Sequence, residues 1–188
     1  MSYVEKDIDW DPVFEYTLKI FQITRRRISE KDVEDAIKAS LKNKEKLNRL
    51  VEELKMNPEI TKKPRWYTEI TRSYRLMLWG ERVKERFEIE KKSPGMPVEI
   101  HVLRVGETAF ATNTFELYLD YGVRIRELSR ATQTFLIQKA CCTGTYLPSQ
   151  RSIACGGYGS DPASTDIGPE GGDELVEWTV DTINKMFE

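Results

Sequence analysis

The sequence predicts an α/β or α+β protein built on a mixed sheet of about four strands. Apolar and polar residues alternate over residues 14–23, as in a half-buried strand, and further strand patterns occur at 98–105, 108–113 and 133–140. Between the first and second of these strands the apolar residues follow helical spacing instead, which predicts an N-terminal helical insert. A last apolar stripe over 173–187 predicts a closing C-terminal helix.

The 188 residues are enough for one domain with a sizeable core. We expect a single domain over 1–188, with an arm at 1–13 that docks on the body, a first strand plus helical insert at 14–93 and an α/β portion at 94–188. The formal net charge of −2 gives no pull toward nucleic acid. No apolar run approaches the ~20 residues of a transmembrane segment, and the N-terminus lacks a secretory pattern, so we expect a cytoplasmic protein.

The helical insert is expected to hold three helices. Ser29, followed by acidic residues, predicts the N-cap of the first helix, and the second and third are predicted at 46–56 and about 64–91. Segment 93–97 contains two prolines and a glycine and is the clearest break in the chain. The arginine run at 25–27 is either a solvated strand end or a place for an anionic ligand.

In the second half, Thr114 is a suitable N-cap for a helix over 115–128, in which Asp120 and Arg124 have the spacing of a surface ion pair. A loop rich in glycine and small polar residues then follows the last strand, over 141–172. The alternation patterns together predict a core at Leu18, Ile20, Val102, Phe110, Phe135, Ile137 and Trp178.

Glu116 and Tyr146 are the candidate site residues, because each comes just after a predicted strand. The negative charge of Glu116 would be stabilised by the dipole of the helix that begins there. It would also lie at the edge of the sheet where open sheets bind ligands. The alternative is a helix-capping acid. Tyr146 could donate a hydrogen bond to an oxyanion or, deprotonated, bind a metal; the alternative is a packed loop tyrosine.

Other motifs point less directly to chemistry. The single histidine, His101, would have to carry any triad or multi-histidine zinc site alone. Adjacent Cys141 and Cys142 cannot easily reach one tetrahedral ion together, so small buried residues are expected. The glycines at 156–159 lack the lysine and helix of a phosphate loop. Those at 168–172 lead into the last helix, where Asp173 is the expected cap, and indicate either an anion site or a plain turn.

Four segments, taken as a set, resemble the late part of the neutral/alkaline, non-lysosomal ceramidase family. They are GETAFATNTFE at 106–116, YGVRIR at 121–126, GTYLP at 144–148 and PASTDIGP at 162–169. Their order and rough spacing match as well, and the resemblance covers about residues 97–188.

This resemblance implies a zinc amidase that cleaves the amide of a sphingoid lipid. Members of the family hold zinc with two histidines, a glutamate and a tyrosine, and attack with a serine. Glu116 matches the glutamate and Tyr146 the tyrosine, so both are implied metal ligands and Tyr146 an implied catalytic residue. The sequence departs from the family at 114–115, where Pro-Gly is usual, and around Thr143, where an earlier tyrosine is usual.

The zinc histidines and the serine of the family precede everything in this chain, and His101 matches neither histidine. We therefore interpret the chain as the C-terminal part of a ceramidase-like amidohydrolase, with an incomplete zinc site and no activity alone. It would need a partner chain carrying the N-terminal half, or form a homo-oligomer. The alternatives are a non-catalytic binding or structural module and, less well supported, an unrelated small α/β hydrolase, which the missing Gly-x-Ser-x-Gly elbow disfavours.

Overall fold

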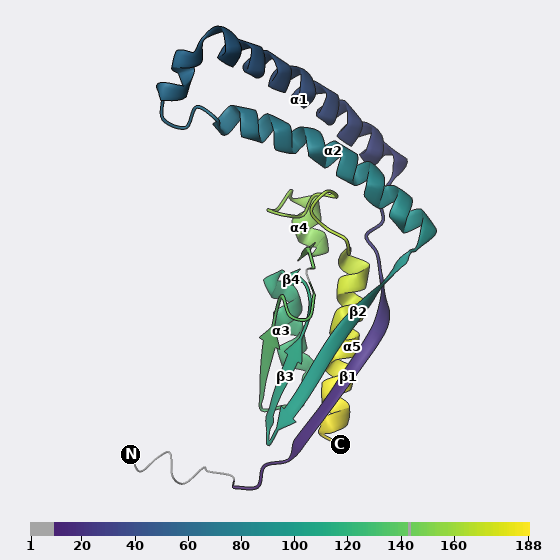
Figure 1. Ribbon diagram of the computed structural model, residues 1–188. Helices are drawn as coiled ribbons and strands as arrows, with labels where there is room; N and C mark the ends of the chain where they lie inside the picture. The colour runs from purple at the N-terminus through teal and green to yellow at the C-terminus, as the bar shows by residue number, and fades with distance from the viewer. Residues whose placement is uncertain (1–9, 143) are drawn as a thin grey trace. The chain divides into compact units, whose positions relative to one another are not determined.

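The structure is a computed structural model that describes residues 10–142 and 144–188 (Figure 1). Its residues divide into two units: Arg27–Pro94 is one, and Gly95–Glu188 together with the described residues before Arg27 is the other. The predicted arm lies mostly outside the described residues, but Trp10 within it is 86% exposed and is not docked. Within the described part of the chain, no helix has the length and apolar character needed to span a membrane.

The helical unit contains α1 (Glu30–Met56), the short η1 (Pro58–Lys62) and α2 (Thr68–Lys92). Ser29 caps α1 as predicted, since its hydroxyl accepts from the Asp32 amide at 3.1 Å and the Asp32 carboxylate accepts from the Ser29 amide at 2.8 Å. The two helices predicted up to Met56 are one continuous helix, because neither proline nor glycine interrupts the segment between them. Gly80 allows α2 to pack closely on α1.

The other unit is built on the predicted mixed four-stranded sheet. Its order is β1-β2-β3-β5, with antiparallel pairing of β1 with β2 and of β2 with β3, and parallel pairing of β3 with β5. Gly106, in the left-handed region (φ 57°), forms the tight turn between β2 and β3. The strands are β1 (Phe14–Thr24), β2 (Gly95–Val105), β3 (Thr108–Thr112) and β5 (Gln133–Ile137).

Two helices cover one face of this sheet. The closing helix α5 (Pro169–Met186) packs along β1 and β2, and α3 (Leu119–Leu128) forms the crossover between the parallel strands β3 and β5 (Figure 1). The core lies between the sheet and these helices, and its members include Val98, Ile100, Val102, Ile125, Leu175 and Ile183.

The opposite face of the sheet is exposed, and here the predicted core was wrong. Ile20 is 62% exposed and Phe135 42%, while of the seven predicted core residues only Val102 is fully buried. The buried side chains of β1 are Phe21 and Ile23, in the second half of the strand. We call the exposed surface the open face and define it by Tyr16, Leu18, Ile20, Phe110, Phe135 and Ile137.

The predicted helix start at Thr114 was also wrong. Thr114 and Phe115 are buried, Glu116–Leu117 forms the short strand β4, and α3 begins only after Tyr118. At α5, the cap is Gly168 rather than Asp173, with a proline at the first helical position.

Candidate functional site

The structure brings the two predicted site residues together. β4 (Glu116–Leu117) pairs in parallel with β6 (Tyr146–Leu147), and Glu116 and Tyr146 are direct partners in this pairing. The Glu116 amide donates to the Thr145 carbonyl at 3.1 Å, and the Tyr118 amide donates to the Leu147 carbonyl at 3.2 Å. Two residues thirty positions apart in sequence thereby present their side chains from one small sheet.

The side chains of this pair are hydrogen-bonded to each other. The Tyr146 hydroxyl donates to the Glu116 carboxylate, and this bond, with partial burial, the charge of Glu116 and the nearby Tyr158, raises the pKa of Tyr146 to about 12. Tyr146 is therefore a neutral hydrogen-bond donor at neutral pH. The dipole argument for Glu116 was wrong, because Glu116 lies in a strand before α3 and not in the first turn of a helix.

An open pocket of about 380 Å³ lies at this pair. Its walls are largely aromatic, and the Tyr146 and Tyr158 rings meet edge to face with centroids 5.6 Å apart. Gly159 (φ 69°) passes so close that an added Cβ would lie 2.5 Å from the Tyr146 ring, so this loop glycine holds the tyrosine in place. The lining residues are Glu116, Leu117, Tyr118, Tyr146, Gly157 and Tyr158.

Arg26 braces the loop that backs the pocket. Its guanidinium donates to the Ser160 carbonyl at 2.6 Å and to the Thr165 hydroxyl at 2.5 Å, and its amide donates to the Asp166 carbonyl at 2.9 Å. The neighbouring Thr145 hydroxyl donates to the Asp166 carboxylate at 3.0 Å. The middle residue of the arginine run is thus a buried structural cation, and neither a solvated strand end nor an anion site.

The glycines at 168–172 serve packing. An added Cβ on Gly172 would lie 2.4 Å from the Tyr121 ring, and one on Gly171 would lie 2.4 Å from the Thr24 carbonyl oxygen. The Glu174 carboxylate also lies near the start of α5, where it accepts from the Thr24 amide at 2.7 Å and from the Thr24 hydroxyl at 2.5 Å. These contacts favour a plain turn at 168–172 over an anion site.

Glu116 and Tyr146 do not by themselves fit a zinc ion. They offer two oxygen donors, whereas zinc sites in proteins use three or four ligands, mostly nitrogen or sulfur. Among the residues that the structure describes, the cluster with the composition of a metal site is Glu99, His101 and Cys141, and it includes neither of them. Thr143, where the sequence departs from the ceramidase pattern, lies outside the described residues.

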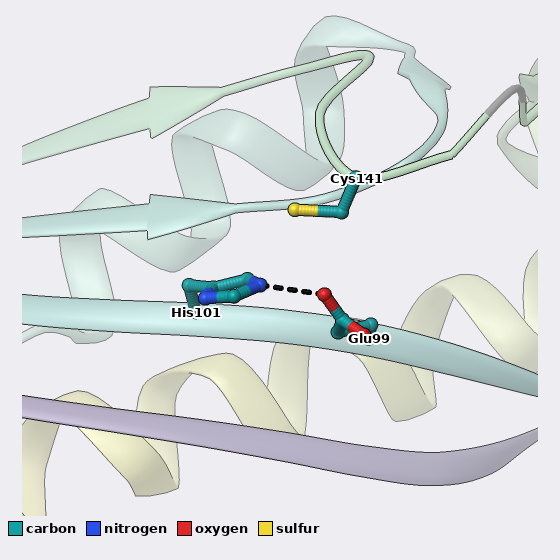
Figure 2. A group of neighbouring side chains, drawn as sticks. All are labelled: Glu99, His101 and Cys141. Carbon is teal, nitrogen blue, oxygen red and sulfur yellow. Dashed lines mark hydrogen bonds and ion pairs between the residues drawn. The ribbon is translucent and has the colours of Figure 1, made fainter.

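This second cluster was missed by the sequence reasoning (Figure 2). Glu99 and His101 are two residues apart in β2, so they share a face of the sheet, and this spacing was visible in the sequence. Cys141 and Cys142 were expected to be buried, but both are exposed. The approach of Cys141 to β2 depends on the order of the strands, which no local pattern contains.

Arg124, predicted to pair with Asp120, instead donates to the Asp173 carboxylate of α5 at 2.5 Å. This ion pair links the start of α5 to α3. It lies on the surface and belongs to the scaffold rather than to either group of candidate residues.

No protein-family model matches the sequence, and no curated protein matches it. Among solved structures, a ceramidase complexed with C2 is similar, with a TM-score of 0.41 and 19% sequence identity. The match covers 50% of this chain and 15% of the ceramidase chain. This chain thus corresponds to a small part of that protein's length, and a likeness at this level assigns neither family nor activity.

Proposed function

We propose that this chain supplies one part of a ceramidase-like amidohydrolase, in which Glu116 and Tyr146 form half of the site and another polypeptide supplies the rest. The observation that carries the proposal is the pairing of these two side chains at the edge of an open, aromatic pocket. The four sequence segments that resemble the ceramidase family support it, because Glu116 and Tyr146 match the glutamate and tyrosine of that family.

Each residue has a role that its own chemistry permits. Tyr146, whose pKa of about 12 keeps it protonated, can donate a hydrogen bond to the oxygen that gains negative charge when an amide is attacked. In the structure Glu116 accepts the one proton of this hydroxyl, so by this proposal the hydroxyl turns from Glu116 to the substrate oxygen as the amide is attacked. The rings of Tyr118 and Tyr158 give the pocket apolar walls, which suit the hydrocarbon part of an N-acyl sphingoid lipid.

The groups of a zinc amidase site that this pocket lacks indicate what the partner would supply. The nucleophile and the nitrogen ligands of a zinc site have no counterpart beside Glu116 and Tyr146 in the described residues. The partner must therefore present histidines and a serine to this pocket. By this proposal the chain is inactive alone.

The test is to isolate the chain with its bound partners from its native cells and to measure fatty-acid release from an N-acyl sphingosine. We expect the complex to be active and the isolated chain to be inactive. Glu116→Gln and Tyr146→Phe should each reduce the rate by about a hundredfold or more, without loss of the partner. Leu119→Ala, an exposed position on α3, is the matched control and should change nothing.

The alternative is a non-catalytic binding module, and the open face favours it, because a sheet with one exposed apolar face suits docking. The same experiment separates the two. Partner binding without any amidase activity, or activity unaffected by both site variants, supports the module and contradicts the half-site.

A further inference from the structure

The imidazole of His101 is held at both of its nitrogens on the sheet surface. The Tyr16 hydroxyl contacts Nδ1 at 2.7 Å, and the Glu99 carboxylate contacts Nε2 at 2.7 Å. The backbone is fixed as well, because the His101 amide donates to the Thr112 hydroxyl of β3 at 3.0 Å. The ring therefore has one orientation, with Nε2 turned toward Glu99.

Cys141 approaches this pair from another part of the chain. After β5, the Ala140 amide donates to the Asn113 carbonyl at 2.9 Å, which anchors the loop beside the end of β3. Cys141 follows in the left-handed region (φ 67°), a conformation that is uncommon for residues other than glycine. Figure 2 shows its sulfur above the hydrogen bond that joins His101 and Glu99. One donor atom from each of the three side chains lies within 4.8 Å of the others.

We propose that Glu99, His101 and Cys141 form a binding site for a divalent transition-metal ion, with zinc as the metal that suits the donors best. A carboxylate, an imidazole and a thiolate are three of the ligands that zinc uses. With metal–ligand bonds of about 2.0–2.3 Å, donor atoms of a tetrahedral site are about 3.5 Å apart. Small side-chain rotations would bring the present arrangement to that spacing.

The change on binding is balanced. The ion replaces the hydrogen bond between Nε2 and Glu99, and the proton of the Cys141 thiol passes to solvent. The single proton of the neutral imidazole moves from Nε2 to Nδ1, where it donates to the Tyr16 oxygen. Tyr16 thus acts as a positioning residue that fixes the tautomer needed for coordination through Nε2.

A simple ion pair between Glu99 and His101 explains less of the geometry. It accounts for the 2.7 Å contact but not for the position of Cys141, whose donor atom is held close to both through a less favoured backbone conformation. Three protein ligands leave a fourth position for water or a small ligand, as in catalytic rather than structural zinc sites. This site shares no residue with the Glu116–Tyr146 pair, so it stands independently of the proposed function.

The test is a titration of the purified, reduced chain with Co²⁺, followed by ultraviolet and visible absorption. We expect stoichiometric binding with a sulfur-to-cobalt charge-transfer band, which Zn²⁺ then removes by displacement. Cys141→Ser should abolish the band, and His101→Gln should weaken binding by well over tenfold. Cys142→Ser and Cys155→Ser are matched controls that should keep the band.

Two further variants sharpen the result. Tyr16→Phe should weaken binding by about tenfold while keeping the band, whereas a purely structural tyrosine would leave the affinity unchanged. Glu116→Gln should leave the Co²⁺ affinity and the charge-transfer band unchanged, which separates this site from the proposed half-site. A band that is absent from the wild-type chain, that survives Cys141→Ser, or that is lost in either control cysteine variant would overturn the proposal.

Discussion

The Tyr146 hydroxyl donates a hydrogen bond to the Glu116 carboxylate across the paired strands β4 and β6. This bond is the main cause of the raised pKa of Tyr146, about 12. We predict that Glu116→Gln lowers that pKa toward the ordinary tyrosine value of about 10, because both the charged acceptor and the nearby negative charge are removed. An NMR titration with ¹³C-labelled tyrosine measures the change, and Tyr146→Phe identifies the resonance.

The raised pKa of Tyr146 also makes the stability of the fold depend on pH at high pH. The pKa of Tyr146 is raised in the folded state, so its hydrogen bond to Glu116 stabilises the fold fully at pH values below the unfolded-state pKa of about 10. This stabilisation is lost as the pH rises toward the folded-state pKa of about 12. A Tyr146 resonance that titrates near pH 10 in both proteins would contradict the hydrogen bond.

Gly172 lies directly against the Tyr121 ring, and a Cβ there would be 2.4 Å from ring atoms. We predict that Gly172→Ala lowers the free energy of unfolding by about 1–3 kcal/mol, because the ring must shift within a packed core. Gly122→Ala is the matched control in a neighbouring helix. Its Cβ would meet Leu136 at 3.4 Å, so it should be neutral or stabilising by up to about 1 kcal/mol. Chemical denaturation measures both, and equal effects would refute the argument.

Arg26 and Arg27 are adjacent but differ in burial, which gives a second matched pair. Arg26→Ala should destabilise the fold by about 2–3 kcal/mol, because the Ser160 carbonyl and the Thr165 hydroxyl lose a charged donor. Arg27→Ala, at an exposed position, should change stability by less than about 0.5 kcal/mol. Thermal and denaturant unfolding of the two variants check this, and similar losses in both would mean that Arg26 does not brace the loop.

The order of elements followed from the sequence because it depends on local patterns. The strand patterns, the cap at Ser29 and the apolar stripe over 173–187 are each contained in a short stretch of chain, and they predicted the mixed sheet, the helical insert and the closing helix, respectively. The predicted break at 93–97 lies mostly within β2, which begins at Gly95. The start of α3 was misplaced, since Thr114 is a good capping residue by type but is buried beside β4 instead. Tertiary packing overrode the local preference there.

Neither the position of the core nor the cluster of Glu99, His101 and Cys141 could be predicted from local patterns. Alternation in β1 shows which side chains share a face, but not which face the helices cover, so Leu18 and Ile20 were assigned to the core and are exposed. The meeting of Cys141 with Glu99 and His101 depends on the strand order β2-β3-β5 and on the turn after β5. Glu116 and Tyr146 were each chosen because they follow a predicted strand, and the structure makes them direct partners in the pairing of β4 with β6, although the dipole argument for Glu116 was wrong.

The open face gives the last prediction. Its apolar side chains are exposed along a long edge strand, and such a surface favours association with a second chain. We expect the isolated protein to self-associate with rising concentration, measured by sedimentation velocity or light scattering. Ile20→Lys should shift it toward the monomer, because the lysine places charge on this face opposite Glu99, a partner that keeps the strand pairing intact. Leu119→Lys, at an even more exposed position on α3, should leave association unchanged. A monomer at all concentrations, or equal behaviour of the two variants, would show that the open face does not mediate self-association.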